Sequence, residues 1–454
     1  MATHRIQLIG AVGVAVIGVA LARTSAPAAK LADPTFTKDV APILYKNCTV
    51  CHRPSGIGPF SLLDYDSAKA NLDEIHDAVQ GGVMPPWHAT GPHGVFSNDR
   101  RLSDAEKETI LRWIATGAKA GDPKDQPPKP VYSTAWTIGQ PDAVVSMPED
   151  FSVPASGTVE YQYFQVPTNF TEDKWVQAIE IMPGAREVVH HVLVFAAQPP
   201  PANPPAPAPA PAAAPGAAPT PRPAPLFIRL REQNFMPDEN RQDTLHPPPR
   251  NMGSLIGTET PGNNVMVFPQ GAALRIRAGT LITFQMHYTA HGHEMKDRTK
   301  IGFKFASAPP EEEIFASHFF NGGLTLPAGA KDVQVPADLG FGQPIRIWGM
   351  MPHTHLRGTR WQYTAIKPDS TSEIILDVPR YDFNWQTYYM FAKPLDLPAG
   401  SKIRSMAWYD NSASNKSNPD PTIDVKWGDQ TWEEMQYTGF LYSLPGRKVK
   451  SGSH

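Results

Sequence analysis

From Val131 onward, the chain consists of short apolar segments separated by Gly, Pro, Asn and Asp residues. The sequence contains 49 prolines, each of which removes a backbone donor and disfavours the interior of a helix. Short strands at frequent intervals predict a β-sandwich or jelly-roll architecture. The clearest candidate strands are 158–166, 175–181, 188–196, 281–288, 345–350 and 402–409. We therefore predict two all-β domains, at 133–306 and 307–446, followed by a tail at 447–454.

Three segments have compositions that do not suit a folded core. The N-terminus has a short basic start, a long apolar run and a small-x-small site at 20–22. This pattern predicts a secretory signal peptide within 1–29, and an uncleaved membrane anchor is the alternative. Both place the rest of the chain outside the cytoplasm. Residues 123–132 have the composition of a linker, and the Pro/Ala-rich insertion 198–225 is predicted to be extended or disordered, without chemistry.

The chain has only two cysteines, and both lie in the sequence Cys48–Thr49–Val50–Cys51–His52. A disulfide is one use of such a pair in an exported protein. A Cys-x-x-Cys pair followed directly by His, however, is typical of haem c attachment. Two thiols must reach the two vinyl groups of one porphyrin while the imidazole binds its iron. We predict one covalent haem c on Cys48 and Cys51, with His52 as an iron ligand, and no structural disulfide.

The sequence on both sides of this motif has helical patterns. Residues 39–47 carry apolar side chains at helical spacing and lead into the motif. Ser103 and Glu106 have the spacing of a capping box, which predicts a helix that ends near Gly117. Two such helices resemble the paired terminal helices of class I cytochromes c. We therefore predict a small all-α cytochrome c domain at 30–122.

The second iron ligand can be predicted by elimination. Met84 is the one methionine between residues 31 and 128, and two prolines follow it directly. A thioether opposite His raises the haem potential and suits electron transfer. His76, His88 and His93 offer bis-histidine ligation instead, and an open site is a further alternative. We predict Met84, which makes the haem an electron carrier.

Histidines of the β region gather in three places. They are His190 with His191, His287 with His291 and His293, and His353 with His355. Side chains at positions i and i+2 of a strand share one face, so His353 and His355 can approach one ion. Adjacent His190 and His191 diverge on an ideal strand, and they can share an ion only if the strand kinks or if the rings use different nitrogens. Single histidines are usually surface or core residues, and each pair still lacks a third ligand.

Four short motifs occur in an order and spacing that are similar to those of one enzyme family. They are VHHVLVF at 189–195, FQMHY at 284–288, HTHLRG at 353–358 and WEEM at 432–435. Over roughly 131–444, the chain resembles the copper type II, ascorbate-dependent monooxygenases. This family includes peptidylglycine α-hydroxylating monooxygenase and dopamine β-monooxygenase. The cytochrome-fused, exported architecture looks bacterial. We therefore expect the protein in the bacterial periplasm, or on the outer face of the inner membrane if the signal is not cleaved.

The resemblance implies two copper sites with different ligands. His190, His191 and His287 would form an all-imidazole site in the first β domain, and the catalytic, O₂-binding site in the second would consist of His353, His355 and Met435. The donor chemistry agrees, because imidazole suits both oxidation states of copper and a thioether favours Cu(I). His291 and His293 have no counterpart in the family motifs, and we interpret them as surface or supporting groups.

Two features depart from the family. Its animal members are rich in disulfides, whereas both cysteines of this chain belong to the haem motif. In the peptide-amidating enzyme, an arginine two residues before the His-x-His motif binds the peptide carboxylate, and Met351 occupies that position here. A peptidylglycine substrate is therefore not expected. Trp348, Met350 and Met351 favour a less polar substrate if they face the cleft.

The resemblance implies an exported monooxygenase that hydroxylates a C–H bond of an organic substrate with O₂. We expect the haem to deliver electrons to the two copper ions. An external donor, either an ascorbate-like reductant or a periplasmic redox protein, would supply them. A non-catalytic copper-binding or electron-transfer protein is the alternative. The formal net charge of -3 gives no indication of nucleic-acid binding.

Overall fold

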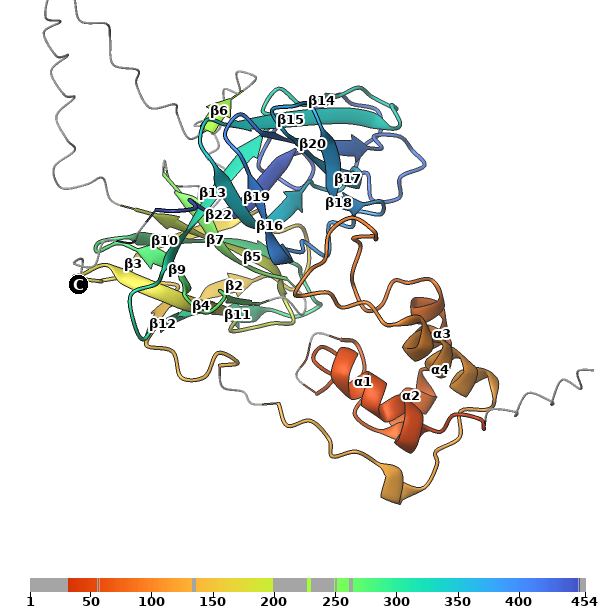
Figure 1. Cartoon of the computed structure of the whole chain (residues 1–454). Helices are drawn as coiled ribbons and strands as arrows, with labels where there is room; N and C mark the ends of the chain where they lie inside the picture. The colour runs from red at the N-terminus through yellow and green to blue at the C-terminus, as the bar shows by residue number, and fades with distance from the viewer. Residues whose placement is uncertain are drawn as a thin grey trace, which may run out of the picture. The chain divides into compact units, whose positions relative to one another are not determined.

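The computed structural model describes residues 32–54, 56, 58–132, 136–198, 227–229, 249, 251–260, 264–447 and 449, with the backbone alone at 227–229. The chain divides into two units, Met1–Asp33 and Pro34–His454, and all elements below lie in the second (Figure 1). The predicted signal peptide, nearly all of the Pro/Ala-rich insertion and the end of the predicted tail fall outside the described residues. Among the described helices, none combines the length and the apolar character that a membrane span requires.

The helical elements are short and precede the β region. They are η1 (Phe36–Val40), α1 (Ala41–Asn47), α2 (Tyr65–Ala70), α3 (Leu72–Gln80), α4 (Asp104–Ala115) and η2 (Pro123–Asp125). The capping box of α4 is confirmed: the Glu106 backbone N–H donates to Ser103 Oγ, and the Ser103 backbone N–H donates to the Glu106 carboxylate. A small apolar cluster that includes Phe36 and Trp113 packs these helices together.

The prediction of a small all-α domain ahead of two β domains is wrong. The described residues form four α-helices and twenty-two strands, and α4, with 12 residues, is the longest of these helices. Irregular segments rich in Pro and Gly separate α1 from α2 and α3 from α4, because both residues interrupt helical structure. One such segment packs into the β region. Trp87 and Phe96 belong to an apolar cluster built mainly by strands, and Phe96 forms a β-bridge with Phe391. Segment 36–125 is therefore not a self-contained all-α domain.

The largest sheet has nine strands and extends across residue 306, where we placed the boundary between two β domains. Its order is β1 (Ala143–Ser146), β12 (Lys300–Phe305), β4 (Lys174–Met182), β9 (Ala272–Ile276), β13 (Glu312–Phe320), β22 (Tyr437–Ser443), β16 (Ile345–His353) and β19 (Tyr389–Leu397), and β8 (Val265–Val267) pairs with β4. Strands β9 and β13 pair in parallel, with Ala272 opposite Glu312. This pair joins the two halves of the β region into one continuous sheet.

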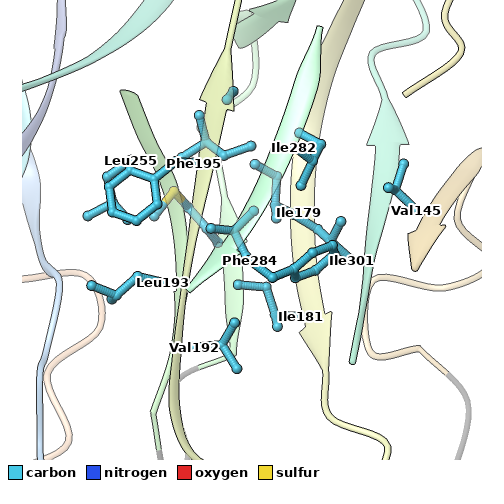
Figure 2. Packing of buried hydrophobic residues seen from close by; sticks show 14 of the residues in the cluster. Val145, Ile179, Ile181, Val192, Leu193, Phe195, Leu255, Ile282, Phe284 and Ile301 are labelled. Carbon is cyan, nitrogen blue, oxygen red and sulfur yellow. The ribbon is translucent and has the colours of Figure 1, made fainter. Parts of the chain in front are cut away.

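A four-stranded sheet packs against the first half of the large sheet. Its order is β3 (Gln162–Pro167), β10 (Leu281–Tyr288), β5 (Val189–Ala197) and β7 (Ser254–Glu259). Side chains from both sheets meet in one apolar cluster, in which Ile179, Ile181, Phe284 and Ile301 are almost fully buried (Figure 2). Burial of each such side chain contributes about 1.5–3 kcal/mol of hydrophobic stabilisation. Strands β5 and β10, which carry three predicted ligands, are thus held by a packed core.

A five-stranded sheet covers the second half of the large sheet. Its order is β18 (Ser372–Val378), β17 (Gly358–Ile366), β20 (Lys402–Tyr409), β15 (Val333–Phe341) and β6 (Phe227–Arg229). Trp361 and Tyr363 of this sheet share an apolar cluster with Ile347 and Phe440 of the large sheet. Two small ribbons complete the fold, one formed by β2 (Phe151–Val153) with β11 (Met295–Asp297) and one by β14 (Thr325–Leu326) with β21 (Val425–Lys426).

The predicted strands are present. Strands β4, β5, β10 and β20 agree with the predicted segments to within about one residue at each end. The predicted strand at 158–166 begins later, at Gln162, and the predicted strand at 345–350 continues to His353. The second difference places the first histidine of the His-x-His motif at the end of a strand.

Candidate functional site

The first histidine group lies on two neighbouring strands of the four-stranded sheet. His191 on β5 is the register partner of His287 on β10, and the next pair is Val189 with Tyr288. His190 is therefore the extra residue of a β-bulge. A bulge bends the strand and redirects its side chains. This is the kink that two adjacent histidines need in order to share one ion.

The three rings of this group offer nitrogens within 4.8 Å of one another. The Nδ1 atoms of His190 and His191 are 3.0 Å apart. His190 Nε2 lies 2.9 Å from the Asn384 carbonyl oxygen, which only accepts, so Nε2 carries the proton and Nδ1 has a lone pair. His191 Nδ1 lies 3.3 Å from the Gln386 amide nitrogen, a donor, so it also has a lone pair. Two such lone pairs suit a shared cation, because metal–imidazole bonds measure about 2 Å.

The surroundings keep these imidazoles neutral. Burial, with a smaller contribution from the charge of His190, lowers the pKa of His287 to about 3. Burial also lowers the pKa of His190, and it lowers the pKa of His191 well below the usual value. His287 Nδ1 is buried and has no hydrogen-bond partner in the described part of the chain. Neutral imidazoles with available nitrogens fit a copper ion.

The second histidine group begins where β16 ends. His353 is the last residue of β16, and the ring of His355 lies 5.2 Å from it, centroid to centroid. His353 Nδ1 lies 2.8 Å from the Gln386 carbonyl oxygen, and His355 Nδ1 lies 3.2 Å from the Glu433 carbonyl oxygen. Both oxygens accept, so each Nδ1 donates and each Nε2 keeps its lone pair for another ligand. Burial lowers the pKa of His353 to about 4 and that of His355 well below the usual value.

Glu434 connects the third member of this group, Met435, to the His-x-His motif. Its buried carboxylate accepts backbone N–H bonds from His355 at 2.8 Å, Arg357 at 2.6 Å and Met435 at 3.1 Å. Burial raises the pKa of Glu434 to about 7, and the three hydrogen bonds and the Arg357 charge oppose this shift. The Tyr409 hydroxyl donates to the Met435 carbonyl at 2.7 Å. Hydrogen bonds therefore hold both the N–H and the carbonyl group of Met435.

The two histidine groups lie next to each other around a few shared side chains. The ring centroid of Phe383 lies between 5.6 and 6.5 Å from those of all five histidines. Gln386 donates to His191 Nδ1 and accepts from His353 Nδ1, which links one group to the other. Tyr161 packs in the same place, with its hydroxyl 3.3 Å from His191 Nε2. We call these five histidines, with Met435, the histidine centre.

Five supporting side chains were not among the predicted site residues: Tyr161, Phe383, Asn384, Gln386 and Glu434. Glu434 belongs to the WEEM motif, and an acidic residue directly before a predicted ligand was the available signal. Phe383 and Gln386 lie in the connection between β18 and β19. No sequence pattern connects that segment with histidines far away in the chain, because the contact exists only in the folded protein.

A cavity of about 310 Å³ opens beside the second group. His353, His355 and Met435 contribute to its lining, and most of the other lining side chains are aromatic or aliphatic, among them Leu193, Phe195, Met252, Phe320 and Trp427. Tyr437 also borders the cavity, and its hydroxyl is buried with no hydrogen-bond partner in the described structure. The hydroxyl is therefore covered by protein atoms, and the cavity can hold a mainly apolar molecule.

The apolar side chains around the cavity are not the ones that we predicted from the sequence. Trp348, Met350 and Met351 do not border this cavity within the described residues, and all three are buried in apolar clusters. Trp348 donates its indole N–H to Ser443 Oγ at 2.7 Å. Alternate residues of a strand face opposite sides, and these three positions on β16 face packed cores on both.

The haem motif borders a second cavity, of about 260 Å³. Cys48 and Cys51 follow α1, are free thiols and border this cavity together with His52. Met84 borders the same cavity from the segment after α3. The alternative ligands do not contribute to the lining within the described residues: His76, His88 and His93. The structure thus brings the four predicted haem-binding residues to one space.

The side chains around this cavity fit a covalent haem. His52 Nδ1 lies 3.2 Å from the Phe60 carbonyl, so Nδ1 donates and Nε2 has the lone pair that an iron ligand needs. A Cβ added at Gly58 would lie 2.7 Å from His52 Nδ1, so this ring needs a glycine beside it. Burial lowers the pKa of His52 and raises that of the Cys48 thiol to about 12. The imidazole is neutral, and much of the remaining lining is aliphatic.

His291 and His293 belong to neither site. They are exposed between β10 and β11, with ring centroids 6.2 Å apart. They serve below as control positions for the buried histidines.

No family model matches the sequence, and no curated protein matches it. Among solved structures, the major capsid protein P2 from Bacteriophage PM2 is similar at 9% identity and a TM-score of 0.25, over 68% of this chain and 100% of that chain. A structure of infectious bursal disease virus, Gx strain, is similar at 8% identity and a TM-score of 0.19, over 68% of this chain and 74% of that chain. Similarity at this level says nothing about function.

Proposed function

We propose that this chain is an exported monooxygenase that uses haem c and copper to hydroxylate a C–H bond of an organic substrate with O₂. The observation that supports this most strongly is the histidine centre: five neutral imidazoles and one thioether beside an apolar cavity. Its two groups offer different ligand sets, three nitrogens in one and two nitrogens with a sulfur in the other. Both sets suit copper, because imidazole binds either oxidation state and a thioether favours Cu(I).

The two copper ions would be held by different residues of the histidine centre. The ligands are His190, His191 and His287 for the first ion, and His353, His355 and Met435 for the second. Bound copper supplies one-electron redox chemistry and the activation of O₂. The chain supplies the positions. The bulge at His190 aims two Nδ1 atoms at one point, and Glu434 holds Met435 beside the His-x-His motif.

The cavity beside Met435 is the proposed substrate site. Its mainly aromatic and aliphatic lining favours a mainly apolar molecule. The ring of Tyr437 borders the cavity, but its hydroxyl is buried among protein atoms. We infer a mainly apolar substrate.

The reaction needs two electrons and two protons from outside the substrate, because one oxygen atom enters the product and the other leaves as water. An external donor, either an ascorbate-like reductant or a periplasmic redox protein, would supply the electrons. Haem c, held by Cys48, Cys51, His52 and Met84, supplies one-electron storage between that donor and copper. The shared cavity of these four residues and the orientation of His52 support this assignment.

Metal analysis and isotope labelling test the proposal together. The purified protein should contain one haem and close to two copper ions per chain. With ¹⁸O₂, label should enter a product in a screen of apolar substrates, and Met435→Leu should abolish this labelling without changing the haem spectrum. His291→Ala, at an exposed position, should change neither. Two bound copper ions without any labelled product would favour the alternative, a copper-binding electron-transfer protein.

A further inference from the structure

Segment 382–387, in the connection between β18 and β19, has three side chains that contact the histidine centre. Asn384 accepts a hydrogen bond from His190 Nε2 at 2.9 Å. Gln386 lies between the two histidine groups and bonds to both. The ring centroid of Phe383 lies 5.6 to 6.5 Å from the ring centroids of all five histidines. One short segment therefore contacts both proposed copper sites.

Trp385 belongs to the same connection but borders a different space. It contributes to the lining of the haem cavity, together with Cys51 and His52. Within the described lining of that cavity, Trp385 is the one residue from the β region. Its two neighbours in the chain, Asn384 and Gln386, both bond to the histidine centre. The residue that borders the haem cavity is thus adjacent in the chain to two residues that bond to proposed copper ligands.

Hydrogen bonds hold this connection in a compact turn. Trp385 N–H donates to the Asp382 carbonyl at 3.0 Å, and Thr387 N–H donates to the Trp385 carbonyl at 2.8 Å. The Asp382 carboxylate accepts from the backbone and side-chain nitrogens of Asn384, both at 2.9 Å. A fixed turn suits electron transfer, because tunnelling slows steeply with distance and is faster along covalent and hydrogen bonds than across gaps.

We propose that Trp385 is the relay residue between haem c and the copper ions. This inference rests on the proposed function, because it needs both cofactors. Each transfer moves one electron: haem iron is oxidised from ferrous to ferric, one copper ion is reduced from cupric to cuprous, and no proton or bond changes place. The route runs from the indole along the backbone to Gln386, and across its hydrogen bond to the Nδ1 of His353, whose Nε2 stays available to copper. Trp385 itself is unchanged at the end.

Tryptophan fluorescence tests the position of Trp385 without turnover. A haem quenches an indole beside it, so Trp385→Phe should leave the emission of the haem-loaded protein nearly unchanged. Trp175 borders neither cavity, so Trp175→Phe is the matched control and should lower the emission more. If the loss with Trp385→Phe equals or exceeds the loss with Trp175→Phe, Trp385 does not lie beside the haem and the relay is overturned.

The transfer itself can be measured without O₂ or substrate. The haem is photoreduced in protein that holds cupric copper, and its reoxidation is followed by absorbance. Trp385→Leu should slow this step at least tenfold, Trp385→Phe should slow it less, and Trp175→Phe should have no effect. The haem spectrum, the haem potential and the copper content of the same samples verify that each variant is folded and loaded.

The outcomes separate the relay from the function on which it rests. A wild-type rate in Trp385→Leu, with haem and copper both present, overturns the relay and leaves the proposed function intact. Wild-type protein that binds no haem or no copper overturns the proposed function, and the relay with it. A slower rate with unchanged haem potential and copper content supports the relay.

Discussion

In the first histidine group, His191 and His287 face each other across paired strands, whereas in the second group His353 ends a strand and His355 lies beyond it. The spacing of the first group is therefore set by backbone hydrogen bonds and by one bulge. The spacing of the second depends on side chains, because Gln386 orients His353 and Glu434 fixes both His355 and Met435.

The two groups should therefore be disrupted by different substitutions. A ligand set built into a sheet is rigid, and rigid ligands suit repeated one-electron exchange because they need not move. A ligand set held by side-chain hydrogen bonds can be loosened by replacing one side chain that does not itself bind the metal. The second group should therefore be the more sensitive to substitutions outside the ligands.

The largest effect is expected for Glu434→Ala. It leaves three buried backbone N–H groups without an acceptor, at about 1–3 kcal/mol each, so the free energy of unfolding should fall by at least about 3 kcal/mol. The second group should lose its copper while the first keeps one ion. Urea unfolding and copper analysis measure the two effects. Glu434→Gln, which keeps one acceptor oxygen, should lose less. Loss of both ions to the same extent would contradict the comparison.

His287→Leu should separate copper binding from stability in the first group. The substitution removes a buried nitrogen that has no partner among the described residues, so the free energy of unfolding of the copper-free protein should stay unchanged or rise by about 1 kcal/mol. Copper content should nevertheless fall by one ion per chain. Thermal unfolding without copper, followed by metal analysis, measures both. A clear loss of stability would mean that the imidazole, and not the strand pairing, holds this region together.

Asn384→Ala and Gln386→Leu compare the supporting hydrogen bonds of the two groups. Removing such a partner of a metal-binding histidine typically lowers metal affinity 10–100-fold. We expect about tenfold for Asn384→Ala at the first group, because the strand register remains, and about 100-fold for Gln386→Leu at the second. Competition with a copper chelator gives the affinities. His293→Ala is the exposed control, and equal effects of the first two variants would remove the distinction.

Tyr437→Phe should have the smallest effect. It removes an unpaired buried hydroxyl, so the free energy of unfolding should stay unchanged or rise by about 1 kcal/mol. The ring that borders the cavity is kept and the hydroxyl is buried, so substrate binding should change by less than about twofold, or about 0.4 kcal/mol. Urea unfolding and binding titrations measure the two effects. Substrate binding weakened tenfold or more would mean that the hydroxyl reaches the cavity.

The strands could be predicted because their signals are local. Period-two alternation and turn residues lie within about ten residues, and β10 and β20 were predicted with the bounds that they have. The capping box of α4 is local in the same sense. The prediction of an all-α domain was wrong because it could not include contacts between residues far apart in the chain. Helical periodicity says nothing about Trp87 and Phe96, which pack against strands almost three hundred positions later.

In the candidate site, too, the residues with local sequence signals could be predicted and the others could not. The six proposed copper ligands occur in short motifs, but the i, i+2 argument for His353 and His355 assumed one strand, and β16 ends at His353. The side chains that orient them come from elsewhere, since Phe383 and Gln386 follow β18 and Tyr161 precedes β3. Single-sequence patterns carry no information about such pairings, which depend on how the sheets pack.

The segment after α3 has a consequence for electron supply. Thr90 N–H donates to the Asp377 carbonyl at 2.9 Å, and Ser97 N–H donates to the Met390 carbonyl at 2.8 Å, so this segment is bonded to the β region. The haem motif is thus anchored on its C-terminal side well before the linker at 123–132. Lengthening that linker would not release it as a mobile tether. Electron delivery to the histidine centre would then follow first-order kinetics, with a rate that is independent of protein concentration and of linker length.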